Sequence, residues 1–197
     1  MNVPKVRRRA LAEWALLIGV PVLLYLTGLH TEAIGGIQRV LLSTGWMRAK
    51  ALPVDKQMAG DYDLSLVSLE GKKINVADLR GKVVFMNLWA TWCPPCVAEM
   101  PGIQKLYEKV DSNQVVFVML SLDEQAEKAR KFIKKKGYTF PVYLLDGELP
   151  AVYSTASIPT TYVLAPNGQI VVRKEGMAEY DDQRFVDLLQ KLAEKGR

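Results

Sequence analysis

The stretch WATWCPPCVAEMP, residues 89–101, holds the only two cysteines of the chain, Cys93 and Cys96. It overlaps the end of KVVFMNLWA, residues 82–90, an apolar run of strand length that is typical of a central strand covered on both faces. A helix is predicted over 95–110, because proline fits the first turn of a helix, where its missing N–H costs nothing. Both cysteines therefore stand where a buried strand ends and a helix begins.

Three chemical interpretations of the cysteine pair compete. A structural zinc site needs about four nitrogen or sulfur ligands, and the chain adds only His30 to its two thiols; a site shared between two chains is the remaining metal alternative. A structural disulfide here would close too small a loop to constrain the unfolded chain. In the third interpretation the helix dipole stabilises the Cys93 thiolate and lowers its pKa, while Cys96 attacks a mixed disulfide. Such a redox pair requires no metal and no organic cofactor.

The region from Tyr62 onward alternates between strand and helix patterns. YDLSLVSL, EGKK and INVADL predict a hairpin over 62–79, and APNG predicts a turn between the last two strands. The order β-β-β-α-β-α-β-β-α predicts an α/β fold with helices on both faces of the sheet and a hairpin at one edge. Further strands are predicted over 114–123, 140–146, 160–166 and 169–176, and helices over 124–137 and 181–195.

The charge of the chain is unevenly distributed. The formal net charge is +5, and residues 1–54 carry seven Lys and Arg against two Glu, so the remainder is electroneutral. A nucleic-acid-binding surface on the globular part is therefore not supported. With 49% hydrophobic and 24% charged residues, the composition is that of one folded domain with an appendage.

The N-terminal segment has the properties of a membrane anchor. ALAEWALLIGVPVLLYLTGL, residues 10–29, carries one charge, Glu13, and as a helix it spans about 30 Å, the thickness of the bilayer hydrocarbon. The basic tail 1–9 precedes it and is expected to stay in the cytoplasm. We predict a single-pass anchor in the inner, cytoplasmic membrane and a periplasmic or otherwise extracytoplasmic domain. A cleaved signal peptide and a buried soluble helix are the alternatives.

Residues 30–60 are expected to connect this anchor to the domain. In IGGIQRVLLSTGWM, residues 34–47, apolar residues recur at roughly helical spacing. This juxtamembrane amphipathic segment either lies along the membrane–water boundary or packs against the domain. ALPVDKQMAGD, residues 51–61, is interpreted as a linker, and the globular domain is placed at 61–197.

Two motifs resemble those of a known family. WATWCPPC resembles the thioredoxin signature W-x-x-W-C-x-P-C, and in SIPTTYVLAPNG Pro159 occupies the place of the proline that precedes the fourth thioredoxin strand. With the membrane-tethered layout, these motifs resemble the TlpA/ResA-like thiol–disulfide oxidoreductases over about residues 60–195. The resemblance implies a thioredoxin-like fold, with a central mixed sheet flanked by helices and an extra N-terminal β-hairpin.

The resemblance also implies roles for single residues near the cysteines. Pro159 is expected in the cis form facing the disulfide. The backbone of neighbouring Ile158 is expected to bind an extended substrate peptide in the manner of strand addition. Trp92 is expected to cover the disulfide as an apolar lid, and Trp89 to pack beneath it.

Two polar residues depart from the thioredoxin pattern. Many thioredoxins carry a buried aspartate six residues before the first cysteine, where this chain has Asn87, which cannot titrate. Glu99 lies on the same side of the helix as Cys96 and resembles the active-site glutamate of the ResA-like proteins. We predict that Glu99 tunes the cysteines and moves the proton when Cys96 attacks. The alternative is an ordinary surface glutamate.

The predicted activity is dithiol–disulfide exchange through Cys93 and Cys96. The resemblance implies a reductase of protein disulfides outside the cytoplasm, with the reduction of apocytochrome c during cytochrome c maturation as one such role. The expected partners are proteins with disulfides or thiols, a membrane electron donor of the thiol-relay type and the lipid bilayer, but no nucleic acid.

Three alternative functions remain open. A disulfide-forming oxidase would use the same residues. A thiol peroxidase of the redoxin family would require a T-x-x-C motif, but Ala90 occupies the position three residues before Cys93. A membrane-tethered binding module would need no reactive cysteine.

Overall fold

The structure is a computed structural model of the 197-residue chain. It describes residues 13–15, 17–20, 22–23, 29–42 and 47–196. The predicted basic tail 1–9 lies outside the described residues, as do several positions of the predicted anchor 10–29. Among the residues that are described, no helix has both the length and the apolar character needed to cross a bilayer.

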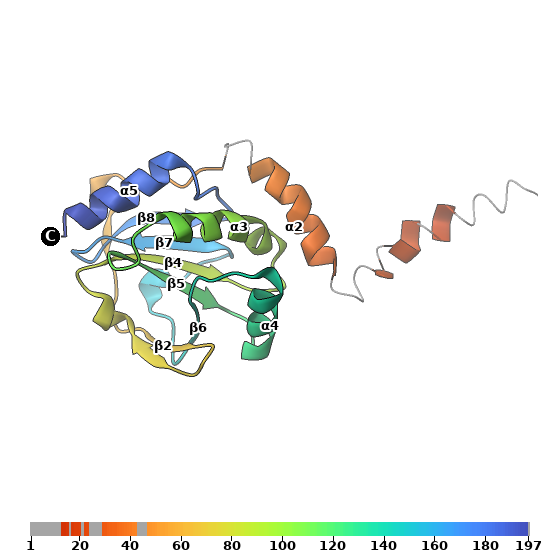
Figure 1. Cartoon of the computed structure of the whole chain (residues 1–197), viewed down its shortest axis with the longest axis horizontal. Helices are drawn as coiled ribbons and strands as arrows, with labels where there is room; N and C mark the ends of the chain where they lie inside the picture. Colours follow the sequence, from red (N-terminus) through yellow and green to blue (C-terminus); the bar gives the residue numbers. More distant parts are fainter. Residues whose placement is uncertain (1–12, 16, 21, 24–28, 43–46, 197) are drawn as a thin grey trace, which may run out of the picture.

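An eight-stranded mixed sheet forms the centre of the domain, in the order β1-β8-β7-β4-β5-β6-β2-β3 (Figure 1). The three strands β4, β5 and β6 are parallel to one another, and β7 pairs antiparallel with β4. The predicted α/β fold with a mixed sheet is therefore confirmed. The five consecutive strands from β8 to β6 are β4 (Val83–Trp89), β5 (Val115–Ser121), β6 (Val142–Leu145), β7 (Thr160–Leu164) and β8 (Gln169–Glu175).

The predicted N-terminal hairpin is present but shorter than expected. It consists of β2 (Ser65–Ser68) and β3 (Lys73–Asn75), and β2 pairs with β6 at the edge of the parallel strands. The chain after β3 forms the 3₁₀ helix η2 (Val76–Leu79) instead of more strand. Asn75 favours this change, because its side chain accepts a hydrogen bond from the backbone N–H of Ala77 and caps the new helix.

The segment predicted to be a linker belongs in part to the sheet. It contains the 3₁₀ helix η1 (Val54–Lys56) and the two-residue strand β1 (Met58–Ala59), which pairs antiparallel with β8. Before η1, in the same segment, the N–H of Leu52 donates to the carbonyl of Val171 in β8 at 2.7 Å. The expectation of a plain linker over 51–61 was wrong, because two residues are too few to show an alternating pattern.

The three long helices of the domain lie on one face of the sheet. They are α3 (Pro94–Lys109), α4 (Ala126–Lys136) and α5 (Gln183–Glu194), and their buried residues share one apolar cluster. The opposite face packs against η2, η3 (Ala151–Tyr153) and loop residues. The prediction of helices on both faces was therefore wrong. The strands β4, β5 and β6 step in one direction across the sheet, and right-handed crossovers between them leave α3 and α4 on the same side.

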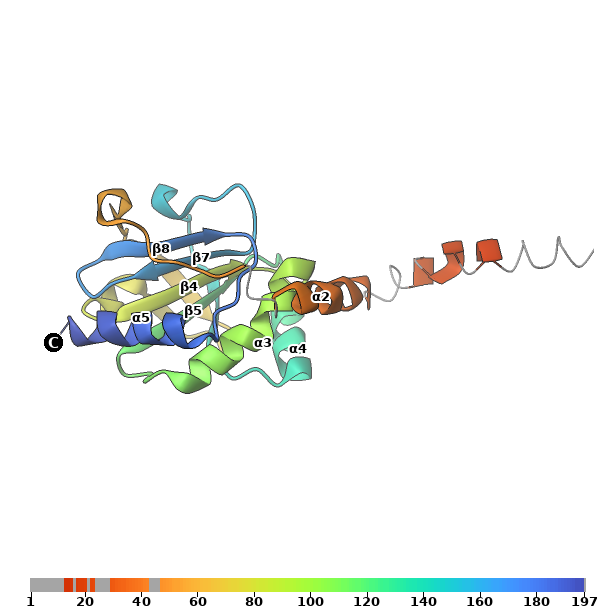
Figure 2. The same ribbon diagram turned by 90° about the horizontal axis from the view of Figure 1, so that it is seen from above.

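One further helix, α2 (Leu29–Leu42), lies beside the N-terminal end of α3 in both ribbon views (Figure 1, Figure 2). The contact is close at Gly35, where an added Cβ would lie 3.1 Å from the carbonyl oxygen of Pro94. Leu42, two turns later, is also buried. Of the two alternatives for this amphipathic segment, packing against the domain is confirmed.

Phe85 of β4 lies in the core between the sheet and the helices that cover it. Its ring is fully buried and lies 4.7 Å from that of Phe117 and 5.3 Å from that of Tyr180. We expect Phe85→Ala to lower the free energy of unfolding by about 3–5 kcal/mol, because it leaves a cavity. Urea unfolding measures the loss, and Val54→Ala, at a position 84% exposed, should change it by less than about 0.5 kcal/mol. Equal effects of the two substitutions would contradict this core.

Candidate active site

Cys93 and Cys96 are joined by a disulfide, so the structure represents the oxidised state. Cys93 follows the end of β4 and is 3% exposed, whereas Cys96 lies one turn inside α3 and is fully buried. Of the three interpretations of the sequence, the structural disulfide and the redox pair both predict this bond. The difference in position makes Cys93 the sulfur nearer to the surface.

The sulfur of Cys93 caps the N-terminus of α3. The backbone N–H of Cys96 donates to Cys93 Sγ at 3.3 Å, and the two intervening prolines have no N–H to offer. The carbonyl of Cys93 accepts the first helical bond, from the N–H of Val97 at 3.1 Å. A thiolate formed here on reduction gains a backbone donor and the positive end of the helix dipole.

The loop before β7 faces the disulfide. The Ile158–Pro159 peptide bond is cis, as expected. The carbonyl oxygen of Ile158 lies 3.7 Å from Cys93 Sγ, which is a contact and not a hydrogen bond because a disulfide sulfur carries no proton. The structure thus brings Cys93, Ile158 and Pro159 together from two distant parts of the sequence.

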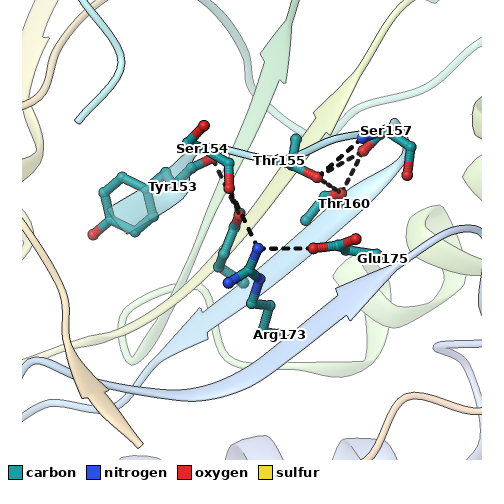
Figure 3. Close-up of polar contacts among 8 residues, drawn as sticks. Tyr153, Ser154, Thr155, Ser157, Thr160, Arg173 and Glu175 are labelled. Carbon is teal, nitrogen blue, oxygen red and sulfur yellow. Dashed lines mark hydrogen bonds and ion pairs between the residues drawn. The ribbon is translucent and has the colours of Figure 1, made fainter. Parts of the chain in front are cut away.

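Hydroxyl groups hold this loop in place (Figure 3). The side chain of Thr160 donates to the carbonyl of Ser157 at 2.7 Å, and the hydroxyl groups of Thr155 and Thr160 lie 2.8 Å apart. Behind the loop, Arg173 of β8 donates to the carbonyl of Ser154 at 3.4 Å and to Glu175 at 2.7 Å. The backbone around the cis peptide bond is therefore anchored from both sides.

The two tryptophans of the motif have different surroundings. Trp89 is fully buried in the cluster that contains both cysteines, and its ring centre lies 5.7 Å from that of Phe132 in α4. Its place beneath the disulfide stays a prediction. Trp92 is 58% exposed beside Cys93. Its role as a lid stays a prediction.

Glu99 is 2% exposed, so the alternative of a surface glutamate is wrong. Its Oε1 accepts a hydrogen bond from Asn87 Nδ2 at 2.8 Å, and its Oε2 accepts one from the backbone N–H of Ala178 at 3.0 Å. Burial raises the pKa of Glu99 to about 8, although both hydrogen bonds and the charge of Lys174 act to lower it. Glu99 therefore carries a proton at neutral pH in the oxidised protein. Its part in catalysis remains a prediction.

Asp123, which was not predicted from the sequence, fixes the loop that leads into Cys93. This buried carboxylate accepts the N–H of Thr91 at 3.0 Å and its hydroxyl at 2.6 Å, and it also accepts the hydroxyl of Ser121 at 2.9 Å. A signal was present in the sequence, because Asp123 is the last residue of the strand predicted over 114–123. The carboxyl ends of adjacent parallel strands meet at one edge of the sheet, where Trp89 pairs with Ser121.

Comparisons with known proteins agree with this geometry. The family model described as Redoxin matches residues 49–189. A thiol-disulfide oxidoreductase ResA of Bacillus cereus is 36% identical over 128 residues, which cover 64% of this chain and 73% of the relative. The chain belongs to the redoxin family. Within that family it is a ResA-type thiol–disulfide oxidoreductase, and its disulfide partners are Cys93 and Cys96.

Solved structures of similar proteins have the same fold. A thiol:disulfide interchange protein from Chlorobium tepidum TLS superposes with a TM-score of 0.56 at 26% identity, covering 67% of this chain and 97% of that one. StoA from Bacillus subtilis superposes with a TM-score of 0.52 at 27% identity, covering 73% of this chain and 98% of that one. The thioredoxin-like fold expected from the sequence is therefore confirmed.

The raised pKa of Glu99 predicts how stability depends on pH in the oxidised protein. The folded state keeps a proton that the unfolded state releases between the ordinary pKa of 4.5 and the folded value of about 8. The free energy of unfolding should therefore fall as pH rises through this range, by up to about 1.4 kcal/mol per pH unit. In Glu99→Gln that contribution to the slope should disappear. Urea unfolding of both proteins at pH 5, 6.5 and 8 measures the free energy of unfolding against pH. The same pH dependence in both proteins would contradict the assigned burial of Glu99.

Proposed function

We propose that the protein is a membrane-tethered reductase of protein disulfides that works outside the cytoplasm. The observation that carries the proposal is the Cys93 sulfur, which caps α3 and lies against the Ile158 carbonyl next to a cis proline. The capping N–H group favours a thiolate at this sulfur, and the neighbouring loop offers backbone to a substrate. Together they favour an attack on extended protein disulfides.

The proposed reaction begins with the protein reduced. The Cys93 thiolate attacks one sulfur of a substrate disulfide, forms a mixed disulfide and releases the other substrate sulfur as a thiolate. Cys96 then gives its proton to Glu99 and attacks the Cys93 sulfur, which forms the internal disulfide and frees the second substrate sulfur. Two electrons have passed from the cysteine pair to the substrate, whose thiolates take up protons from water.

Re-reduction reverses the roles of these groups. One thiolate of a dithiol donor attacks the Cys93 sulfur, and the sulfur of Cys96 leaves as a thiolate. The second donor thiolate then attacks the donor sulfur of this mixed disulfide, which releases Cys93 as a thiolate and leaves the donor oxidised. Glu99, which carries a proton at neutral pH in the oxidised protein, lies one helical turn from Cys96 and supplies that proton. The same carboxyl group thus acts as an acid in one direction and as a base in the other.

Substrate binding is assigned to the rim of the disulfide. The exposed ring of Trp92 offers an apolar surface beside Cys93, and the backbone of Ile158 offers hydrogen-bonding groups to an extended peptide. The hydroxyl bonds around the loop at 154–160 keep this backbone in one shape before the substrate arrives. A preformed edge of this kind reduces the entropy lost on binding.

The proposed tether is the apolar segment 10–29, with the basic tail 1–9 in the cytoplasm and the domain periplasmic or otherwise extracytoplasmic. Support comes from the length and charge pattern of the segment. The helix α2 begins at the end of this segment and packs beside the N-terminal end of α3. A dithiol electron donor in the same membrane would then meet the domain at its active-site end.

The reduction potential separates this proposal from the oxidase alternative, which uses the same residues. We expect a midpoint near that of thioredoxin, about −270 mV, when the protein is equilibrated with glutathione or dithiothreitol mixtures. A value near the strongly oxidising end, about −120 mV, would favour disulfide formation instead. The fraction of alkylated cysteine at each ratio, read by mass spectrometry, gives the midpoint.

A trapping experiment identifies the substrates. In Cys96→Ser the mixed disulfide at Cys93 cannot be resolved, so we expect partner proteins to stay attached until a reductant releases them. The matched control is Cys93→Ser, which should capture far fewer. Apocytochromes c among the partners would support a role in cytochrome c maturation, and a broad set of secreted proteins would support general disulfide reduction. No adducts at all would contradict exchange catalysis and favour a binding module.

A further inference from the structure

A chain of buried polar side chains leads from Glu99 into the core. Asn87 Nδ2 donates to Glu99 Oε1 at 2.8 Å and to Thr161 Oγ1 at 2.9 Å. The hydroxyl of Tyr180 donates to the same Thr161 Oγ1 at 2.6 Å. These side chains come from β4, α3, β7 and the segment before α5. Each of the four residues is at most 2% exposed. Buried polar groups are costly unless they are hydrogen-bonded to one another in this way.

The direction of the hydrogen bonds shows which state of Glu99 this network stabilises. Both Asn87 amide hydrogens are used as donors, whereas Asn87 Oδ1 has no partner among the described residues. Burial and the charge of Glu99 raise the pKa of Tyr180 well above 10, so its phenol keeps its proton and remains a donor. The network therefore presents a donor to Glu99, as a carboxylate requires.

We propose that Asn87 is a positioning residue for the exchange reaction, and that Thr161 and Tyr180 hold its amide so that it stabilises the carboxylate of Glu99. This inference rests on the proposed role of Glu99 in proton transfer to and from Cys96. Thr161 accepts from both neighbours, so it gives the second Asn87 amide hydrogen a partner and favours the orientation in which the amide donates to Glu99. The amide thereby sets the pH range in which Glu99 exchanges its proton.

The other groups around Glu99 act on its carboxyl group in different ways from the Asn87 amide. Lys174 of β8 lowers the pKa of Glu99 through its charge, and the Ala178 N–H binds the second carboxyl oxygen. Glu99 is also among the residues that line a cavity of about 140 Å³. The other charged lining residues are Arg39 of α2, Lys105 of α3, and Glu179 and Asp181 of the segment before α5. Asn87 belongs to β4 and does not line this cavity, so its amide reaches Glu99 from the sheet.

The direct test measures the protonation of Glu99 in the oxidised protein, where neither cysteine titrates. Infrared spectra of protein with ¹³C-labelled glutamate, minus those of Glu99→Gln, report the carboxyl and carboxylate bands of this group alone. We expect Asn87→Leu to raise the midpoint by about one pKa unit, because it removes a donor to the charged form. An unchanged midpoint would overturn the inference.

A second variant covers the case in which Asn87→Leu does not fold. Tyr180→Phe removes only the donor to Thr161 and should move the midpoint in the same direction by a smaller amount. The matched control is Tyr153→Phe, which removes a buried phenol that donates to the carbonyl of Asp61 at 2.7 Å on the opposite face of the sheet. Equal midpoints in Tyr180→Phe and Tyr153→Phe would also count against the network.

Kinetics separate this inference from the proposed function. The rate of reduction of the oxidised protein by dithiothreitol is measured against pH in the wild type, Asn87→Leu, Glu99→Gln and the double variant. We expect the pH dependence to shift upward in Asn87→Leu by the same amount as the infrared midpoint, and no effect of Asn87→Leu in the Glu99→Gln background. If Glu99→Gln leaves the profile unchanged, the proposed role of Glu99 fails. If only Asn87→Leu leaves it unchanged, the positioning role alone fails.

Discussion

The hydrogen bond from the Cys96 N–H to the sulfur of Cys93 places the reactive atom at the end of a helix dipole, and the rest of the site is arranged around it. The bond exists only because β4 delivers the chain to that point and two prolines begin α3 without competing N–H groups. Asp123 then holds the connecting turn at Thr91. The strand, the turn and the helix thus act as one unit that fixes the position of a single sulfur.

The two faces of the sheet differ in the functional residues that they bury. The face covered by α3, α4 and α5 contains the disulfide and the buried chain from Glu99 to Tyr180. The opposite face contains Tyr153 and Tyr162, whose hydroxyl groups bond to backbone carbonyls and stabilise loops. Redox and proton-transfer groups therefore share one apolar compartment, where low polarity shifts the pKa of a carboxyl group further than a surface position would.

The match to the redoxin family begins at residue 49, so α2 and everything before it lie outside the shared domain. The segment after α2 is nevertheless joined to that domain. The N–H of Glu179 donates to the carbonyl of Met47 at 2.7 Å, and Arg48 lies within 3.7 Å of the carboxylates of Glu179 and Asp182. These contacts join residues 47 and 48 to the segment that precedes α5.

The sequence alone determined the features that local patterns encode. The CPPC motif between an apolar strand and a helix, the cis proline and the mixed α/β sheet were all predicted, because each depends on a few neighbouring residues and on resemblance. Only the tertiary structure decided the burial of Glu99, the bonds from Asp123 and the chain through Asn87, Thr161 and Tyr180. Those contacts join residues up to 79 positions apart, and no local periodicity records them. The single helix-covered face also came from the structure, since it follows from the order in which the strands pair.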